Sequence, residues 1–216
     1  MSEEAENVAD AVAELPDDVR EEIAEAVRAA LAKHGYAGLT TRKVAAESER
    51  SEAFFFYHCD TKADLILVFL EWAAGWSLDR FAAAAAEPDP VRKLYLACDC
   101  LLGDPDDEFE RGMNVAMMEL LSHAPHDAAF RDRLEAYERR VLSDLADIIR
   151  EGVETGVLQA VDPEATAAFL LMAADGTAGA VHALGMRDVE AGVRDRLFDY
   201  LDTKLLAEGV DPPEGF

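Results

Sequence analysis

Hydrophobic residues recur every three or four positions along most of the chain, with charged and polar residues between them. Val19, Ile23, Val27 and Leu31 follow at intervals of four, which predicts an amphipathic helix that Gly35 ends. The same period predicts further helices over residues 61–86, 90–102, 107–122, 127–155, from 163 onwards and over 189–207. The strict alternation that is typical of strands is missing from the sequence. The pattern therefore predicts an all-α chain of about nine helices.

Two further helices, both short and close together, are predicted between the first helix and residue 61, at residues 41–48 and 52–58. Residues 49–51 interrupt the apolar pattern between them. A helix, a short turn and a second helix form the geometry that places the second helix in the major groove of DNA. The second helix carries four aromatic residues in succession at positions 54–57. A helix of about two turns cannot bury rings on every side, so some of these rings are expected at the surface.

The residues of this segment closely resemble the DNA-binding domain of TetR-type repressors, over residues 35–65. The matching motifs, each at the family's spacing, are Gly35-Tyr36, Leu39-Thr40-Thr41-Arg42-Lys43-Val44-Ala45, Phe55-Phe56-Tyr57-His58, Thr61-Lys62 and Leu65. Glu49 replaces the family's turn glycine. Phe54 and Phe56 replace residues whose hydroxyl groups reach phosphates in the family.

The resemblance implies a three-helix, helix-turn-helix DNA-binding domain followed by a C-terminal helical bundle. On this division, residues 1–16 form an acidic tail and residues 17–66 form the DNA-binding domain. Residues 67–216 then form a domain that senses a ligand and dimerises.

The start of the helix at residue 41 has the chemistry of a phosphate clamp. Arg42 and Lys43 open it, and Thr40 or Thr41 caps it. Arg42 could also reach a guanine edge. The alternative interpretation is a capped surface helix with solvated charges.

The second helix offers apolar and acidic groups to the bases. Phe56 could rest against a thymine methyl group, and Glu52 could accept a hydrogen bond from a cytosine amino group. Together with the resemblance, these arguments predict DNA contacts from Thr40, Thr41, Arg42, Lys43, Arg50, Ser51, Glu52, Phe54, Phe56, Tyr57, His58 and Lys62.

The net charge opposes DNA binding at first sight. It is −25, from 45 acidic and 20 basic residues, whereas a nucleic-acid-binding domain is expected to be basic. Residues 33–66, however, carry five basic and five acidic side chains. The high acidity and the few lysines indicate the salt-rich cytoplasm of a halophile, the alternative being an ordinary acidic protein. At molar salt the Debye length is about 3 Å, so distant repulsion is screened and base and apolar contacts must carry more of the binding.

The resemblance also implies a pocket for a small, apolar effector and a homodimer. The bulky residues predicted to line the pocket are Trp72, Trp76, Tyr95, Met113, Met117 and Tyr137. An ordinary bundle core is the alternative for each of them. The small and leucine-rich surfaces predicted to form the dimer interface are Gly176, Gly179, Leu197, Leu201 and Leu205.

Other chemistries find little support in the sequence. Cys98-x-Cys100 on a helix would point its sulfur atoms about 200° apart, which does not suit one metal ion. His123-x-x-His126 spans a helix end without nearby cysteines. Common hydrolase, nucleotide-binding and zinc-protease motifs are missing. We therefore expect no metal, no cofactor and no enzymatic activity.

Three cysteines without a signal peptide, and no apolar run of about 18 residues, predict a cytoplasmic protein that does not cross a membrane. The resemblance implies a sequence-specific transcriptional regulator, a repressor released from double-stranded DNA by an effector. The alternative is a helical ligand-sensing or protein-interaction module whose helix-turn-helix no longer binds DNA.

Overall fold

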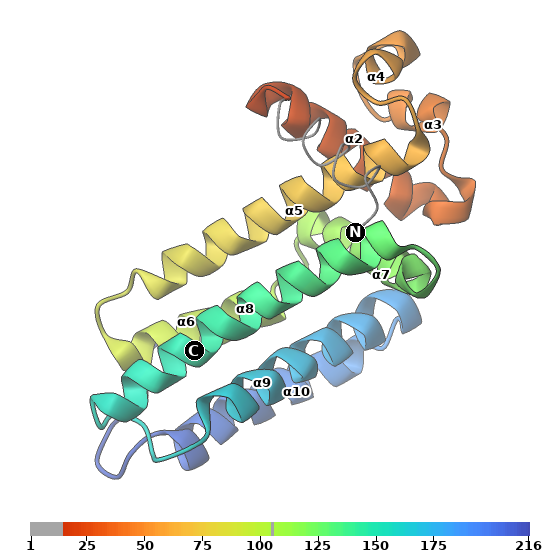
Figure 1. The fold of residues 1–216 in the computed structure, drawn as a ribbon. Coiled ribbons are helices and arrows are strands. Elements are labelled where there is room, and N and C mark those ends of the chain that lie inside the picture. The colour runs from red at the N-terminus through yellow and green to blue at the C-terminus, as the bar shows by residue number, and fades with distance from the viewer. Residues whose placement is uncertain (1–14, 105) are drawn as a thin grey trace. The chain divides into compact units, whose positions relative to one another are not determined.

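The structure, a computed structural model, describes residues 15–104 and 106–216 (Figure 1). The predicted acidic tail lies almost wholly outside the described residues. The described part contains nine α-helices and no sheet, which confirms the all-α prediction. Their bounds are α2 Asp17–Gly38, α3 Thr41–Ala45, α4 Glu52–His58, α5 Lys62–Ala85, α6 Pro90–Leu102, α7 Glu108–His123, α8 Ala128–Glu154, α9 Pro163–Ala178 and α10 Arg187–Tyr200.

Local signals set several of these ends. At the start of α5, the Thr61 amide donates to Asp64 Oδ2 (2.8 Å) and the Asp64 amide donates to Thr61 Oγ1 (3.1 Å), a reciprocal capping box. Asp89 caps α6 by accepting from the amide of Val91, and Asp162 caps α9 by accepting from that of Ala165.

Gly35 breaks the first helix, as predicted. It has a φ of 65° inside α2, in the left-handed region that favours glycine, and the helical turn continues past it to Gly38. Glu49 does not adopt the left-handed conformation. Among the described residues, every positive φ belongs to a glycine. The turn between α3 and α4 is therefore built without the left-handed residue that the family's glycine provides.

The chain divides into two compact units. The first unit comprises residues up to Trp76 together with Glu108–Ala136, and the second comprises Ser77–Asp107 and Tyr137–Phe216. The predicted boundary after residue 66 does not coincide with this division, because α7 packs on α2 and joins the first unit. The division into DNA-binding and ligand-sensing domains stays a prediction about function.

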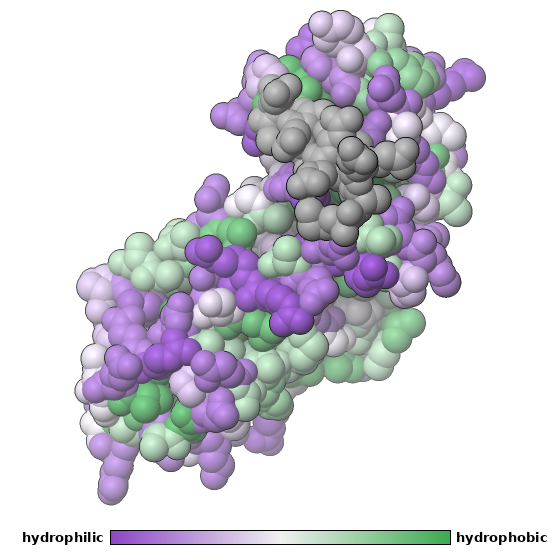
Figure 2. All heavy atoms as spheres, viewed as in Figure 1, coloured by the Kyte–Doolittle hydropathy of each residue, from purple (hydrophilic) through white to green (hydrophobic). Residues whose placement is uncertain are grey.

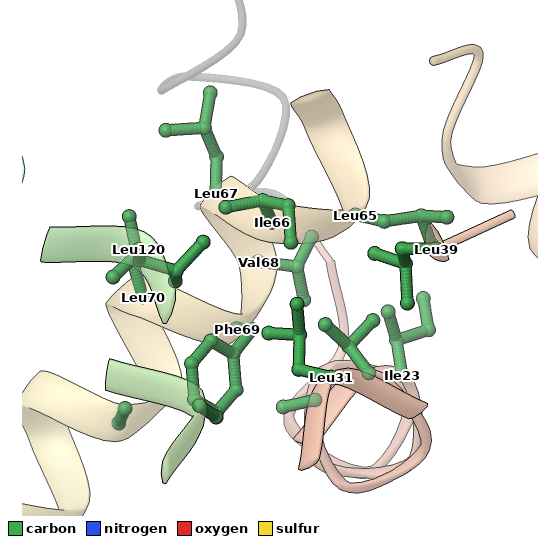
Figure 3. Close-up of a cluster of buried hydrophobic side chains, with 14 of the residues drawn as sticks. Ile23, Leu31, Leu39, Leu65, Ile66, Leu67, Val68, Phe69, Leu70 and Leu120 are labelled. Atoms are coloured by element: carbon green, nitrogen blue, oxygen red, sulfur yellow. The ribbon is translucent and has the colours of Figure 1, made fainter. Parts of the chain in front are cut away.

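The core of the first unit is formed mainly by α2, α5 and α7. Figure 3 shows Leu31 of α2 near Val68 and Phe69 of α5, and Ile23 of α2 beside Leu39. Val44 of α3 and Phe55 of α4 are fully buried in the same cluster. The two short helices are thus each anchored by one apolar side chain, and their remaining faces stay near the surface.

The second unit is a helical bundle of α6, α9, α10 and the later part of α8. Two π-helical turns follow α9 and α10, at Gly179–Ala183 and Leu201–Leu205. A single antiparallel bridge pairs Leu158 with Leu206. No helix in the described part of the chain is long and apolar enough to span a membrane.

Candidate nucleic-acid interface

The first helix of the helix-turn-helix, α3, begins at Thr41 and is capped by Thr40. Thr40 is extended, and its hydroxyl oxygen accepts from the amide of Lys43 (3.3 Å). The ammonium of Lys43 turns back and donates to the carbonyl of Gly38 (2.7 Å). Arg42 is exposed and forms no hydrogen bond or ion pair with the described residues. Of the two predicted clamp cations, only Arg42 is therefore unengaged.

The turn between α3 and α4 ties its own arginine to the helix below. Arg50 Nε donates to Glu22 Oε1 on α2 (2.7 Å), and its guanidinium lies 5.0 Å from the centre of the Phe54 ring. The hydrogen bond and charge of Glu22 raise the pKa of Arg50. Ser48 Oγ accepts from the amide of Arg50 (3.1 Å), which closes the turn.

The second helix, α4, separates its aromatic residues by face. Phe55 is fully buried, and the half-buried Phe54 packs edge-on against Phe55 and His58. Phe56 and Tyr57 are 52% and 84% exposed. Two of the four consecutive rings thus lie at the surface, as the sequence predicts, and Figure 2 shows hydrophobic residues reaching the surface in the region of α4.

The start of α4 is also exposed. Ser51, at the cap position, makes no side-chain cap hydrogen bond. The carboxylate of Glu52 forms no ion pair with the described residues. A carboxylate therefore stands at the front of the helix that would enter the groove.

Lys62 is engaged within the first unit rather than free to meet a phosphate. Its ammonium donates to the carbonyl of Tyr36 and lies 3.8 Å from the centre of the Tyr36 ring. Burial lowers its pKa. Sequence reasoning missed this role because the two residues lie 26 positions apart.

The predicted pocket residues fall into two separate hydrophobic clusters. In the first unit, Trp72 and Trp76 lie 6.0 and 5.3 Å from the ring of Phe109, Met113 is buried, and Met117 packs against the core. The guanidinium of Arg28 sits 4.3 Å from the same Phe109 ring. This aromatic group therefore already holds a cation of its own chain.

The two tyrosines belong to the second unit. Tyr95 is buried, and its hydroxyl donates to Asp202. The hydroxyl groups of Tyr137 and Ser77 are 2.7 Å apart. The six residues do not come together as one set within either unit, which favours the core interpretation for Tyr95 and Met113.

The leucines predicted to form a dimer interface are core residues. Leu201 and Leu205 are fully buried and Leu197 is 6% exposed in the core of their own unit, so these three side chains leave little surface for a partner. Their spacing of four marks an apolar face, but α10 turns that face into its own unit. Gly176 is exposed and Gly179 is half-buried.

A different apolar surface was missed. The large hydrophobic residues exposed on and after α9 are Phe169, Met172, Leu184 and Met186. Phe169 and Met172 lie three positions apart and share a helix face, a spacing that could have indicated the surface from sequence.

The fold and the α3–α4 pair define the chain as a helix-turn-helix regulator. A family model described as the C-terminal domain of BetI-type transcriptional repressors matches residues 91–206. The chain belongs to the TetR family of DNA-binding transcriptional regulators, as its helix-turn-helix motifs suggest.

Individual relatives agree with this. A TetR transcription regulator from Haloarcula marismortui is 33% identical, with a TM-score of 0.79 over 88% of this chain and 100% of that chain. The HTH-type transcriptional repressor SCO4008 of Streptomyces coelicolor is 28% identical over 162 residues, which cover 73% of this chain and 77% of the relative. A transcriptional regulator from Saccharomonospora viridis, solved in complex with choline, shares the fold at 22% identity, with a TM-score of 0.79 over 89% of this chain and 100% of that chain.

Proposed function

We propose that this regulator is a repressor that binds a pseudo-palindromic operator as a homodimer and leaves it when a small effector binds. The observation that carries the proposal is the α3–α4 pair, in which one buried residue anchors each helix while Arg42, Phe56 and Tyr57 remain exposed. This is the arrangement needed to lay α4 in a major groove.

The dimer is supported by the apolar surface of Phe169, Met172, Leu184 and Met186. Phe169 and Met172 share one face of α9, and exposed apolar residues of this kind favour a protein partner. The family uses the helices that correspond to α9 and α10 for its dimer. Two copies would present two α4 helices to half-sites about 34 Å apart. The pseudo-palindrome follows from the two-fold symmetry of such a pair.

The effector is proposed to act through the C-terminal domain that the BetI-type model covers. It would favour one of two arrangements of the dimer and so change operator affinity. The resemblance to the family implies a small, apolar compound. Because the Saccharomonospora viridis relative was solved with choline, choline is the first compound to test beside apolar candidates.

We further propose that the protein works in a salt-rich cytoplasm, without enzymatic activity. The charge of −25 supports this setting. Because molar salt removes most of the gain from counterion release, the operator must be read with few phosphate contacts.

The test is recovery of fragmented genomic DNA by the purified protein at molar potassium chloride. Arg42→Ala is the test variant, and Arg131→Ala, another exposed arginine, is the matched control. We expect the wild type and the control to enrich the same few fragments, and Arg42→Ala to lose them.

The competing interpretation is an interaction module with a degenerate helix-turn-helix, favoured by Glu49, Glu52, Phe54 and Phe56. Enrichment of no fragment at any salt concentration would support it and reject the operator proposal.

A further inference from the structure

The outer face of α4 is unusual in its chemistry. Glu52 and Phe56 lie one helical turn apart, as do Ala53 and Tyr57, and all four are exposed. Among these side chains none is a cation. The face therefore offers a DNA base an aromatic ring, a phenol, a methyl group and a carboxylate.

Three of the four neighbouring cations are engaged within the protein, and the fourth, Arg42, is exposed but belongs to α3 rather than to α4. Lys43 is bound to the carbonyl of Gly38, Arg50 to Glu22 and Lys62 to the carbonyl of Tyr36. Arginine or lysine on guanine is the commonest specific contact in the major groove. On α4 that contact has no donor among the described side chains.

The major groove carries one apolar group that distinguishes the bases, the C5-methyl group of thymine. Phe55 is fully buried and fixes the rotation of α4, which leaves the neighbouring Phe56 at the surface. A ring that is 52% exposed on such an anchored helix has apolar surface left to bury.

We propose that Phe56 reads the methyl group of a thymine in each operator half-site. This inference rests on the proposed function, since it needs α4 in a major groove. It assigns Phe56 as a specificity-determining residue and requires an A·T pair at the base step that it covers. Because the contact is apolar, it keeps its strength at the salt concentrations that weaken phosphate contacts.

The experiment uses an operator fragment recovered from genomic DNA. Each thymine is replaced in turn by deoxyuridine, which removes only the methyl group, and affinity is measured by fluorescence anisotropy at molar salt. We expect one thymine in each half-site to be sensitive, with affinity about fourfold lower per half-site, as the loss of one buried methyl group implies.

Protein variants then assign the methyl contact to its side chain. Phe56→Ala should bind more weakly and should no longer distinguish thymine from deoxyuridine at that position. Phe56→Leu should keep part of the discrimination. Leu121→Ala, which shortens an exposed apolar residue on α7, should retain the full thymine preference. Because Phe56 is exposed, its variants should fold, which circular dichroism can verify.

Two outcomes overturn the inference while leaving the regulator intact. In one, the operator is bound and no thymine is sensitive to loss of its methyl group. In the other, the sensitivity persists unchanged in Phe56→Ala, so another group reads the methyl. A chain that enriches no DNA at all rejects the proposed function and this inference together.

Discussion

The backbone amide of Tyr36 donates a 2.8 Å hydrogen bond to Oε2 of Glu119, across 83 residues of sequence. Gly35, with its φ of 65°, interrupts the regular helix of α2 just before that amide. The ring of Tyr36 also lies against the ring of His123, with the ring centres 4.2 Å apart and the planes tilted by 42°. The last turn of α2, after Gly35, is therefore held in place by α7.

Removing this acceptor should loosen the first unit. Glu119→Ala leaves the partly buried Tyr36 amide without a partner, which we expect to cost about 1–2 kcal/mol of unfolding free energy. Glu119→Gln keeps a carbonyl oxygen at the same reach and should cost less. Urea denaturation of the two variants at fixed salt measures the difference, and equal stabilities would contradict this role for Glu119.

Lys62 could either stabilise the first unit or bind a DNA phosphate, and one variant distinguishes the two roles. Because its ammonium binds the Tyr36 carbonyl and ring, Lys62→Met should lower the unfolding free energy by about 1 kcal/mol. If the same lysine binds a phosphate, the variant should instead keep its stability and reduce the salt slope of operator binding by about one. Denaturation and salt titration of one variant decide between these roles, and Lys33→Met, whose ammonium is exposed and paired with Glu47, is the control.

Stability should fall with rising pH because of Glu138. Its Oε2 is buried and has no hydrogen-bond partner among the described residues. Burial together with the charge of Asp175 raises the pKa of Glu138 from 4.5 to about 7. The folded chain then binds this proton more tightly than the unfolded chain does, so stability present below pH 4.5 is lost as the pH rises toward 7.

Glu138→Gln removes the ionisable group while keeping its shape. We expect the variant to be more stable than the wild type above pH 7, by on the order of 1–2 kcal/mol since water still reaches part of the carboxyl. Near pH 4 the two should be similar. Thermal unfolding across pH 4–8 tests this, and parallel pH profiles for the two proteins would exclude the effect.

The surface of α9 and the leucines of α10 should respond differently to substitution. Phe169→Asp places a charge on an exposed ring position and should dissociate the proposed dimer with little change in protomer folding. Leu201→Ala opens a cavity in a fully buried site and should cost about 2–5 kcal/mol of stability.

Sedimentation velocity and denaturation, applied to both variants, separate the two effects. Leu121→Asp is the control for a charge placed on another exposed leucine. A monomeric wild-type protein, or a Phe169→Asp variant that remains dimeric, would reject this surface as the interface.

The sequence by itself determined the helices. Short-range signals carry that information: the capping box of Thr61 and Asp64, the caps at Asp89 and Asp162, and the glycine break at Gly35 all act within a few residues. The helix-turn-helix motifs were likewise contiguous, which is why the family could be identified before any fold was known.

Only the tertiary structure decided what each face of those helices touches. A period of four shows that Leu197, Leu201 and Leu205 share a face, but not that their own unit covers it. The charges of Lys43 and Lys62 were visible in the sequence, yet the carbonyl groups that hold them depend on where the chain passes. Periodicity is a property of one helix, whereas burial and hydrogen bonding depend on segments that folding brings together from far along the chain.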